Sequence, residues 1–303
     1  MSGPRTPADF TVRFDASTIG TDPAAWLAAS EARFSDIRPG LQKEIIWADP
    51  VAKARTPVSI VYIHGFSASK GEVRPLPDIL AKNLKANLFY TRLAGHGRSN
   101  DAMGEASLND WVNDTAEAIA IGERLGDRVV VIATSTGATL TAFALTRPAL
   151  SSKIVAAVFI SPNFAIKARG SSLLTVPWSN KLARAVLGAR RSFTPLNALH
   201  ASLWTTEYPV GVLLPMAELV KRVAALSFSE VRTPTLFVYS PQDQVVDATA
   251  TDAVVKRWGG ITGTIDPGAV EDPFRHVIAG DALSPAATTG LAEKISDWLH
   301  NTL

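Results

Sequence analysis

The feature that most constrains this chain is an alternation of short apolar, β-branched runs with segments of helical periodicity. Residues 58–63 and 154–160 are nearly continuous apolar runs of the kind that form fully buried strands. Residues 110–125 carry apolar side chains at helical spacing, and Ser107 stands where a capping residue would begin that helix. Strands that alternate with helices form a mostly parallel sheet with helices on both faces, so the sequence predicts an α/β fold.

The remaining predicted elements follow the same pattern. Further strands are expected at 87–92, 128–133, 234–239 and 261–265, with an edge strand at 10–14 inside a leader segment, 1–41. Pro285 opens a C-terminal helix whose apolar residues form one stripe.

One segment, residues 162–230, interrupts the alternation. It is punctuated by proline, contains apolar and aromatic residues at helical spacing, and shows no strand pattern. We expect a mainly helical cap here, inserted between two parts of a core domain, 1–161 and 231–303. Between Asn163 and Glu230 this cap holds eight Lys and Arg against three Glu, a net charge of +5. A solvated outer face or a site for anionic groups would explain that charge.

The composition favours a small-molecule partner. With 303 residues and 47% hydrophobic content the chain can bury a large core, while a net charge of +2 indicates neither nucleic acid nor a polybasic membrane anchor. No apolar stretch approaches the roughly 18 residues of a membrane span, and residues 1–20 lack a signal-peptide core. We therefore expect a soluble, cytoplasmic protein without stable membrane insertion; the oligomeric state cannot be read from the sequence.

No motif indicates a cofactor or a metal ion. The chain has no cysteine, which excludes disulfides, thiolate metal sites and a cysteine nucleophile. No G-x-G-x-x-G follows the first strand, and no H-x-x-x-H pair or acidic cluster argues for a metal. We expect neither kind of group.

Ser135 stands in the context that a serine nucleophile requires. It follows the strand-like run 128–132 and precedes the helix-like run 138–146. A sharp strand-to-helix turn exposes such a side chain, and small residues two positions before and after it let neighbouring backbone pass closely. Ala133 and Gly137 occupy those two positions. A serine that only caps a helix would stand in the same sequence context, so a catalytic role for Ser135 depends on whether the chain also offers a base and an acid.

A serine hydroxyl becomes a strong nucleophile when a base takes its proton and an acid orients that base. On a strand-to-helix turn of this kind, the acid and then the base follow the serine along the chain. Among the histidines, His276 and His300 satisfy this order; His300 ends the C-terminal helix, where the helix dipole favours it, so His276 is the expected base. Asp243 and Asp247 both follow a strand, and Asp247 is placed to cap a helix, so Asp243 is the expected acid.

The negative charge of a tetrahedral intermediate requires preorganised hydrogen-bond donors. One expected donor is the N–H of Thr136, directly after the nucleophile. The other is the N–H of Phe66, in the loop that follows the strand at 58–63. His64 and Gly65 can also simply form a tight turn, which would aim the same amide.

These motifs together resemble the α/β-hydrolase superfamily, most closely its capped branch of carboxylesterases and monoacylglycerol lipases. The resemblance extends from residue 58 to the C-terminus and rests on H-G-F at 64–66, R-L-A-G-H-G at 92–97, the segment around Ser135, D-x-V-V at 243–246 and H-V-I-x-x-D at 276–281. It implies an α/β-hydrolase fold with Ser135 as nucleophile, Asp243 as acid, His276 as base and the Phe66 and Thr136 amides as oxyanion hole. His96 is implied to be structural, and Ala133 and Ser240 depart from glycines common in the family.

The resemblance further implies a serine carboxylesterase for short- to medium-chain esters, including monoacylglycerols. Candidate residues for an acyl pocket, which could equally form the core of the cap, are Trp178, Trp204, Leu213, Leu214 and Met216. Two alternatives stay open, since some proteins of this fold keep the triad as ligand receptors and others cleave amide or C–C bonds. S-x-x-K at 67–70 would suggest a penicillin-binding serine enzyme, but S-D-N and K-T-G are absent.

Overall fold

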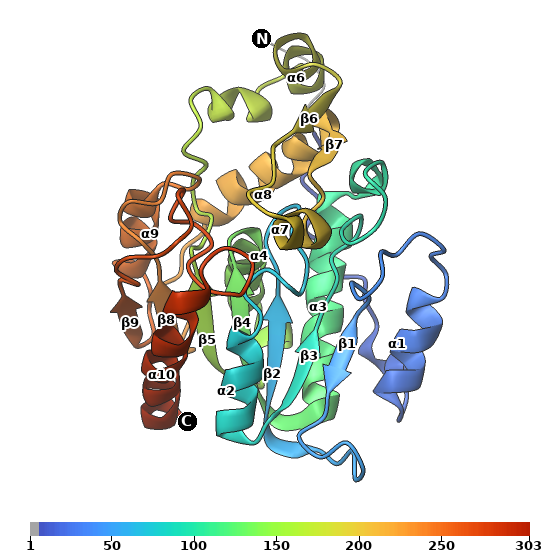
Figure 1. Cartoon of the computed structure of the whole chain (residues 1–303), viewed down its shortest axis with the longest axis vertical. Helices are drawn as coiled ribbons and strands as arrows, with labels where there is room; N and C mark the ends of the chain where they lie inside the picture. The colour runs from blue at the N-terminus through green and yellow to red at the C-terminus, as the bar shows by residue number, and fades with distance from the viewer. Residues whose placement is uncertain (1–5) are drawn as a thin grey trace.

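The centre of the molecule is a seven-stranded, mostly parallel sheet. The structure is a computed structural model that describes residues 6–303; residues 1–5, the start of the expected leader, lie outside the described residues. The strand order is β1-β3-β2-β4-β5-β8-β9, and only β1 and β3 pair antiparallel (Figure 1). These strands are β1 (Glu44–Ile46), β2 (Thr56–Ile63), β3 (Asn87–Tyr90), β4 (Gly126–Thr134), β5 (Ile154–Ile160), β8 (Thr235–Val238) and β9 (Thr262–Ile265). The predicted α/β fold is confirmed.

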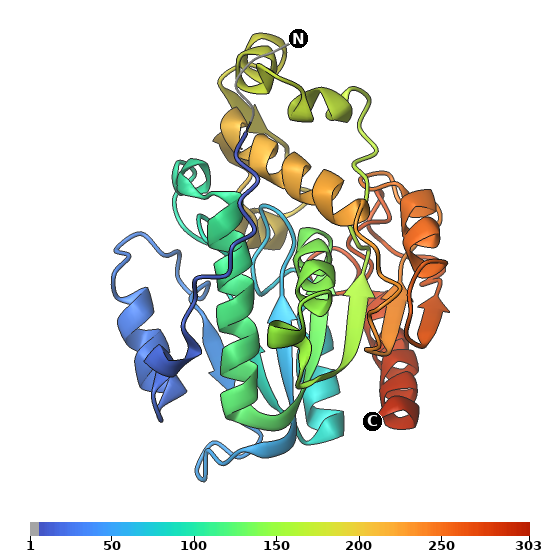
Figure 2. The same ribbon diagram turned by 180° about the vertical axis from the view of Figure 1, so that it is seen from behind.

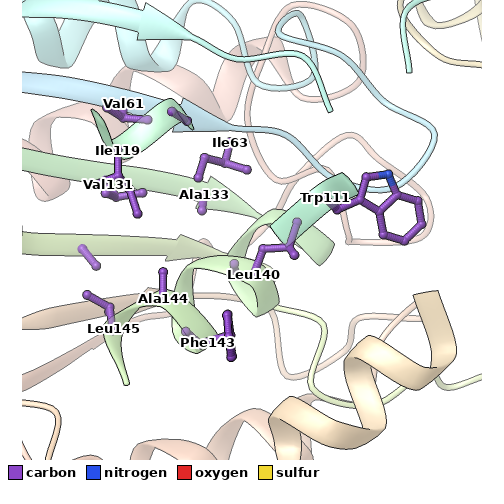
Figure 3. Packing of buried hydrophobic residues seen from close by; sticks show 14 of the residues in the cluster. Val61, Ile63, Trp111, Ile119, Val131, Ala133, Leu140, Phe143, Ala144 and Leu145 are labelled. Carbon is purple, nitrogen blue, oxygen red and sulfur yellow. The ribbon is translucent and has the colours of Figure 1, made fainter. Parts of the chain in front are cut away.

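Helices cover both faces of this sheet (Figures 1 and 2). One face packs against α3 (Leu108–Leu125) and α4 (Thr136–Leu145), the other against α2 (Leu76–Leu84) and α10 (Pro285–Thr302). Val61 and Val131 belong to the first core, near Ile119 (Figure 3), whereas Ile60 and Val130 belong to the second. Because both faces are buried, these strands are continuous apolar runs in the sequence. The remaining core helices are η1 (Ala16–Ile19), α1 (Pro23–Glu31), η2 (Ala102–Glu105), α5 (Pro148–Ser151) and α9 (Ala248–Val255).

Local sequence signals fix several element ends. Ser107 Oγ accepts the Asp110 N–H and the Asp110 carboxylate accepts the Ser107 N–H, so the predicted capping box begins α3. The strand expected at 87–92 is shorter and ends at Tyr90; two residues later, the Arg92 side chain forms a buried two-pronged ion pair with Glu31 (2.7 and 2.9 Å). No helix among residues 6–303 has the length and apolar character needed to cross a membrane.

The segment between β5 and β8 lies above the carboxyl ends of the parallel strands (Figure 1). It contains η3 (Ser171–Thr175), α6 (Ser179–Leu187), β6 (Arg190–Ser192), α7 (Ala198–Leu203), β7 (Glu207–Pro209), η4 (Val210–Val212) and α8 (Leu213–Ala224). β6 and β7 pair antiparallel, so the mainly helical segment also contains a short two-stranded sheet that the sequence did not predict. Each strand has only three residues, too few for a sequence periodicity to show. The domain limits at 161/162 and 230/231 stay a prediction.

The N-terminal segment corrects another expectation. Residues 10–14 form no strand; they run in irregular conformation along α3 (Figure 2). The N–H groups of Arg13 and Phe14 donate to Asn113 Oδ1 on that helix (2.6 and 2.8 Å), so side-chain contacts replace a sheet ladder. The edge of the sheet is instead β1, whose three residues are only partly buried.

Candidate active site

Ser135 occupies a strained turn between β4 and α4. Its backbone has φ 51° and ψ −115°, a conformation that a non-glycine residue keeps only when its surroundings enforce it. Two backbone hydrogen bonds do so: the Ser135 N–H donates to Ile160 O (2.9 Å) and Ser135 O accepts from the Asn163 N–H (3.2 Å). The turn is thereby fixed to the end of the neighbouring strand.

The small residues around this turn play different parts. A Cβ atom on Gly137 would lie 2.3 Å from Ile63 O and 2.6 Å from His64 O, so only glycine lets α4 approach β2 this closely. Ala133 is fully buried beside Ile63 in the sheet, and its methyl group is part of the core (Figure 3). The departure from glycine at position 133 is therefore accommodated by packing.

The structure brings the three expected side chains into one hydrogen-bonded chain. His276 Nε2 lies 3.1 Å from Ser135 Oγ, and His276 Nδ1 lies 2.7 Å from Asp243 Oδ2. The other carboxylate oxygen of Asp243 accepts the N–H groups of Val245 and Val246 (2.7 and 3.0 Å), which fixes the carboxylate plane. All three residues are buried, with exposed fractions of 6% for Ser135, 9% for His276 and 1% for Asp243. This arrangement can transfer a proton from the hydroxyl to the imidazole.

The alternative acid and base lie elsewhere. Asp247 caps α9, where its Oδ1 accepts the Thr249 N–H (3.0 Å). His300 lies near the end of α10 and its Nδ1 bonds Ser296 O (2.8 Å). Neither side chain is hydrogen-bonded to Ser135.

A further carboxylate, absent from the expectations above, shapes the histidine loop. Asp272 Oδ2 accepts the N–H groups of His276 and Val277 (3.0 and 2.8 Å). Burial by itself would lower the pKa of His276, but the hydrogen bond and charge of Asp243, with the charges of Glu72 and Asp272, raise it above its ordinary value. The loop therefore favours a basic imidazole. Aspartates that bind nearby backbone amides occur in many loops, so the sequence alone could not have singled out Asp272.

The Phe66 and Thr136 amides, which are expected to bind an oxyanion, belong to backbone segments that lie next to each other. The loop at His64–Ser67 approaches Ser135 closely: a Cβ atom on Gly65 would lie 3.1 Å from Ser135 Cβ. Within residues 6–303, neither the Phe66 N–H nor the Thr136 N–H donates a hydrogen bond to another protein group. Free amides beside Ser135 can donate hydrogen bonds to an oxygen that becomes negatively charged.

A cavity of about 560 Å³ extends from Phe66 into the cap. Its apolar wall includes Leu174, Leu182, Leu187, Tyr208, Leu213 and Met216. Two arginines, Arg169 and Arg191, also line it, and no acidic side chain does so among the described residues. Across the part of the chain that the structure describes, no cluster of three or more His, Asp or Glu is arranged to hold a metal ion.

Two of the five candidate pocket residues line this cavity. Leu213 and Met216 line the cavity, whereas Leu214 packs inside the cap against Ala183 and Val210. Trp204 is buried in a separate cluster with Val277, and Trp178 is 43% exposed at the outer end of the cap. The apolar spacing of the cap could not separate residues that face the cavity from residues that hold the cap together.

Comparisons with known proteins agree with this architecture. A solved structure from work on LipS and LipT, two metagenome-derived lipolytic enzymes, has a TM-score of 0.70 at 17% identity, with 88% of this chain and 99% of that chain covered. The monoacylglycerol lipase of Paleococcus ferrophilus has a TM-score of 0.61 at 16% identity, with 87% and 99% covered. At these identities the likeness shows the fold, an α/β-hydrolase fold.

The sequence comparisons are more specific. A thermostable monoacylglycerol lipase of Bacillus sp. (strain H-257) is 29% identical over 96 residues, which are 32% of this chain and 38% of that relative's length. The family model described as serine aminopeptidase, S33, matches residues 55–269, from the first central strand to the loop before His276. A match over more than half of the chain establishes membership, and the chain belongs to the serine aminopeptidase S33 family of hydrolases.

Proposed function

We propose that this protein is a serine carboxylesterase that hydrolyses short- to medium-chain carboxylic esters, monoacylglycerols among them. The observation that carries the proposal is the chain of hydrogen bonds from Ser135 through His276 to Asp243, together with an apolar cavity that reaches Phe66, one of the two proposed oxyanion donors. The partial similarity to a monoacylglycerol lipase supports the same substrate class.

Each residue has a defined task in the proposed reaction. His276 Nε2 takes the proton of Ser135 Oγ, and the oxygen attacks the ester carbonyl carbon. The N–H groups of Phe66 and Thr136 then bind the carbonyl oxygen as it becomes negative. The resulting imidazolium, stabilised by Asp243, protonates the leaving alcohol, and water activated by the same imidazole hydrolyses the acyl-enzyme.

The cavity bounds the acyl chain. Each methylene buried against its apolar wall is worth about 0.8 kcal/mol, or roughly a fourfold gain in kcat/KM. We expect this gain to continue while the chain fills the cavity of about 560 Å³ and to reverse when it is full. Rates that rise without limit toward long chains would contradict the proposal.

Amide hydrolysis is a second candidate because the matched family model is described as an aminopeptidase. A free α-ammonium group on a substrate needs a carboxylate partner, yet the described lining of the cavity contains Arg169 and Arg191 and no acidic residue. This charge pattern favours neutral or anionic acyl groups, and therefore the esterase.

The test is steady-state hydrolysis of matched p-nitrophenyl esters and amino-acyl p-nitroanilides by the wild type and by Ser135→Ala. We expect sustained ester turnover, little anilide cleavage and no turnover by the variant. Faster cleavage of the anilides than of the esters would show that the protein is an aminopeptidase and not an esterase. A single covalent event per molecule, without turnover, would indicate a ligand receptor.

A further inference from the structure

Glu72 is a buried carboxyl next to the nucleophile that the reaction above does not use. Its side chain is 2% exposed, and no Lys or Arg among residues 6–303 forms an ion pair with it. One oxygen, Oε2, accepts both the Gly65 N–H (2.7 Å) and the Tyr62 O–H (3.0 Å). Burial of a carboxyl group without a cation costs free energy, and these two hydrogen bonds offset part of that cost.

The carboxyl lies against the loop that carries Phe66. A Cβ atom on Gly65 would lie 2.7 Å from Glu72 Oε1 and 3.1 Å from Ser135 Cβ, so carboxyl and nucleophile flank the same glycine. Glu72 fixes the Gly65 N–H, while the Gly65 carbonyl accepts from His64 Nδ1 (2.9 Å) and from the Ala68 N–H (3.3 Å).

This double restraint sets the direction of one amide. The Gly65 carbonyl and the Phe66 N–H belong to the same planar peptide group. Holding Gly65 at its nitrogen and at its oxygen therefore removes the freedom that a glycine would otherwise give that plane. The Phe66 N–H can then point only to one place.

We propose that Glu72 is a positioning residue for the oxyanion hole, which it orients through the Gly65 amide. The inference rests on the proposed function, because it assigns Glu72 a task in the same reaction. It gives the site a fourth side chain, which acts on the oxyanion through the Gly65 backbone.

The carboxyl also acts on the base. Burial raises the pKa of Glu72 to about 7, although the Gly65 amide, the charge of His276 and the Tyr62 hydroxyl lower it. In the other direction, the charge of Glu72 helps Asp243 and Asp272 to raise the pKa of His276. Removal of this charge should therefore lower the pKa of His276, and the enzyme should stay active to lower pH.

Two substitutions separate positioning from charge. Because both donors bind the same oxygen, Glu72→Gln can keep both hydrogen bonds with its carbonyl oxygen while the charge is lost. Glu72→Asp keeps the charge but is one methylene too short to reach the amide. Thermal unfolding of both variants shows that they fold.

The rates are measured with an ester and with a serine-directed fluorophosphonate, which loses fluoride to Ser135 Oγ and places a phosphonyl oxygen at the oxyanion site. We expect Glu72→Gln to keep the plateau kcat/KM within about threefold and to shift the acid limb to lower pH. Glu72→Asp should lower kcat and the phosphonylation rate by about 10- to 100-fold, with KM nearly unchanged.

Equal rates for Glu72→Asp and the wild type, or a Glu72→Gln variant as slow as Glu72→Asp, would overturn the proposal. Its failure can be distinguished from failure of the proposed function. If the wild type hydrolyses no ester, the phosphonylation rates of the same variants still report whether Glu72 aims the oxyanion hole.

Discussion

Gly137→Ala is the sharpest test of how this site is built. The new methyl carbon would lie 2.3 Å from Ile63 O, 2.6 Å from His64 O and 2.8 Å from Ile63 C. All three atoms are backbone, so no side-chain rotation can relieve the clash, and α4 and the end of β2 must separate by about 1 Å. Overpacking of this kind costs about 3 kcal/mol, of which Ala recovers at most about 1 kcal/mol through its helix propensity.

A net loss of about 2 kcal/mol corresponds to a fall in Tm of roughly 3 °C for a chain of 303 residues. The effect on activity should be larger, because the Phe66 and Thr136 amides lie on the two elements that separate. A misplacement of about 1 Å can lower kcat about 100-fold. Differential scanning calorimetry and steady-state ester hydrolysis measure the two losses.

Gly290→Ala is the matched control. Gly290 lies in α10, and a Cβ atom there would meet no other heavy atom within 4 Å. This variant should be more stable by about 0.5–1 kcal/mol and fully active. A Gly137→Ala protein with the Tm and kcat of the wild type would refute the argument that backbone contact, not glycine flexibility, requires a glycine at this position.

Three further outcomes are expected. Asp243→Asn should lower kcat by about three to four orders of magnitude with a small change in KM, because the asparagine amide would favour the wrong tautomer of His276. An increase in KM as large as the decrease in kcat would instead indicate a role in substrate binding. The raised pKa of His276 means that kcat/KM should fall as pH decreases through that pKa, since the base works only when neutral, and Asp243→Asn should move this limb to lower pH. Leu213→Trp should shift the preferred acyl chain in the ester series to shorter lengths, whereas an unchanged optimum would place the acyl group outside the cavity.

The elements that sequence predicted best are those with purely local or fully buried signals. β2 and β5 are apolar on both faces, and α3 begins with a capping box. All three elements can therefore be predicted without knowing which distant segment packs against them. β1 and the pair β6 and β7 are three residues long and partly exposed, and they exist because a partner strand is near. Strands this short are too brief to show the alternation of apolar and polar residues by which strands are predicted.

The same distinction applies to the site. Ser135, Asp243 and His276 could be chosen because chemistry and chain order restrict each of them to a few positions. Glu72 and Asp272 bind backbone amides that become neighbours only after folding. The faces of the cap likewise depend on how its helices pack, so Leu213 lines the cavity and the adjacent Leu214 does not.

The cap enters the chain after β5 and leaves it before β8, so Ser135, which follows β4, and Asp243, which follows β8, both lie outside it. Each reacting side chain therefore belongs to a turn whose strand is already ordered by the sheet. A segment taken from another hydrolase could be transplanted at these two junctions to recognise a different substrate, while the machinery that breaks the bond would keep its geometry.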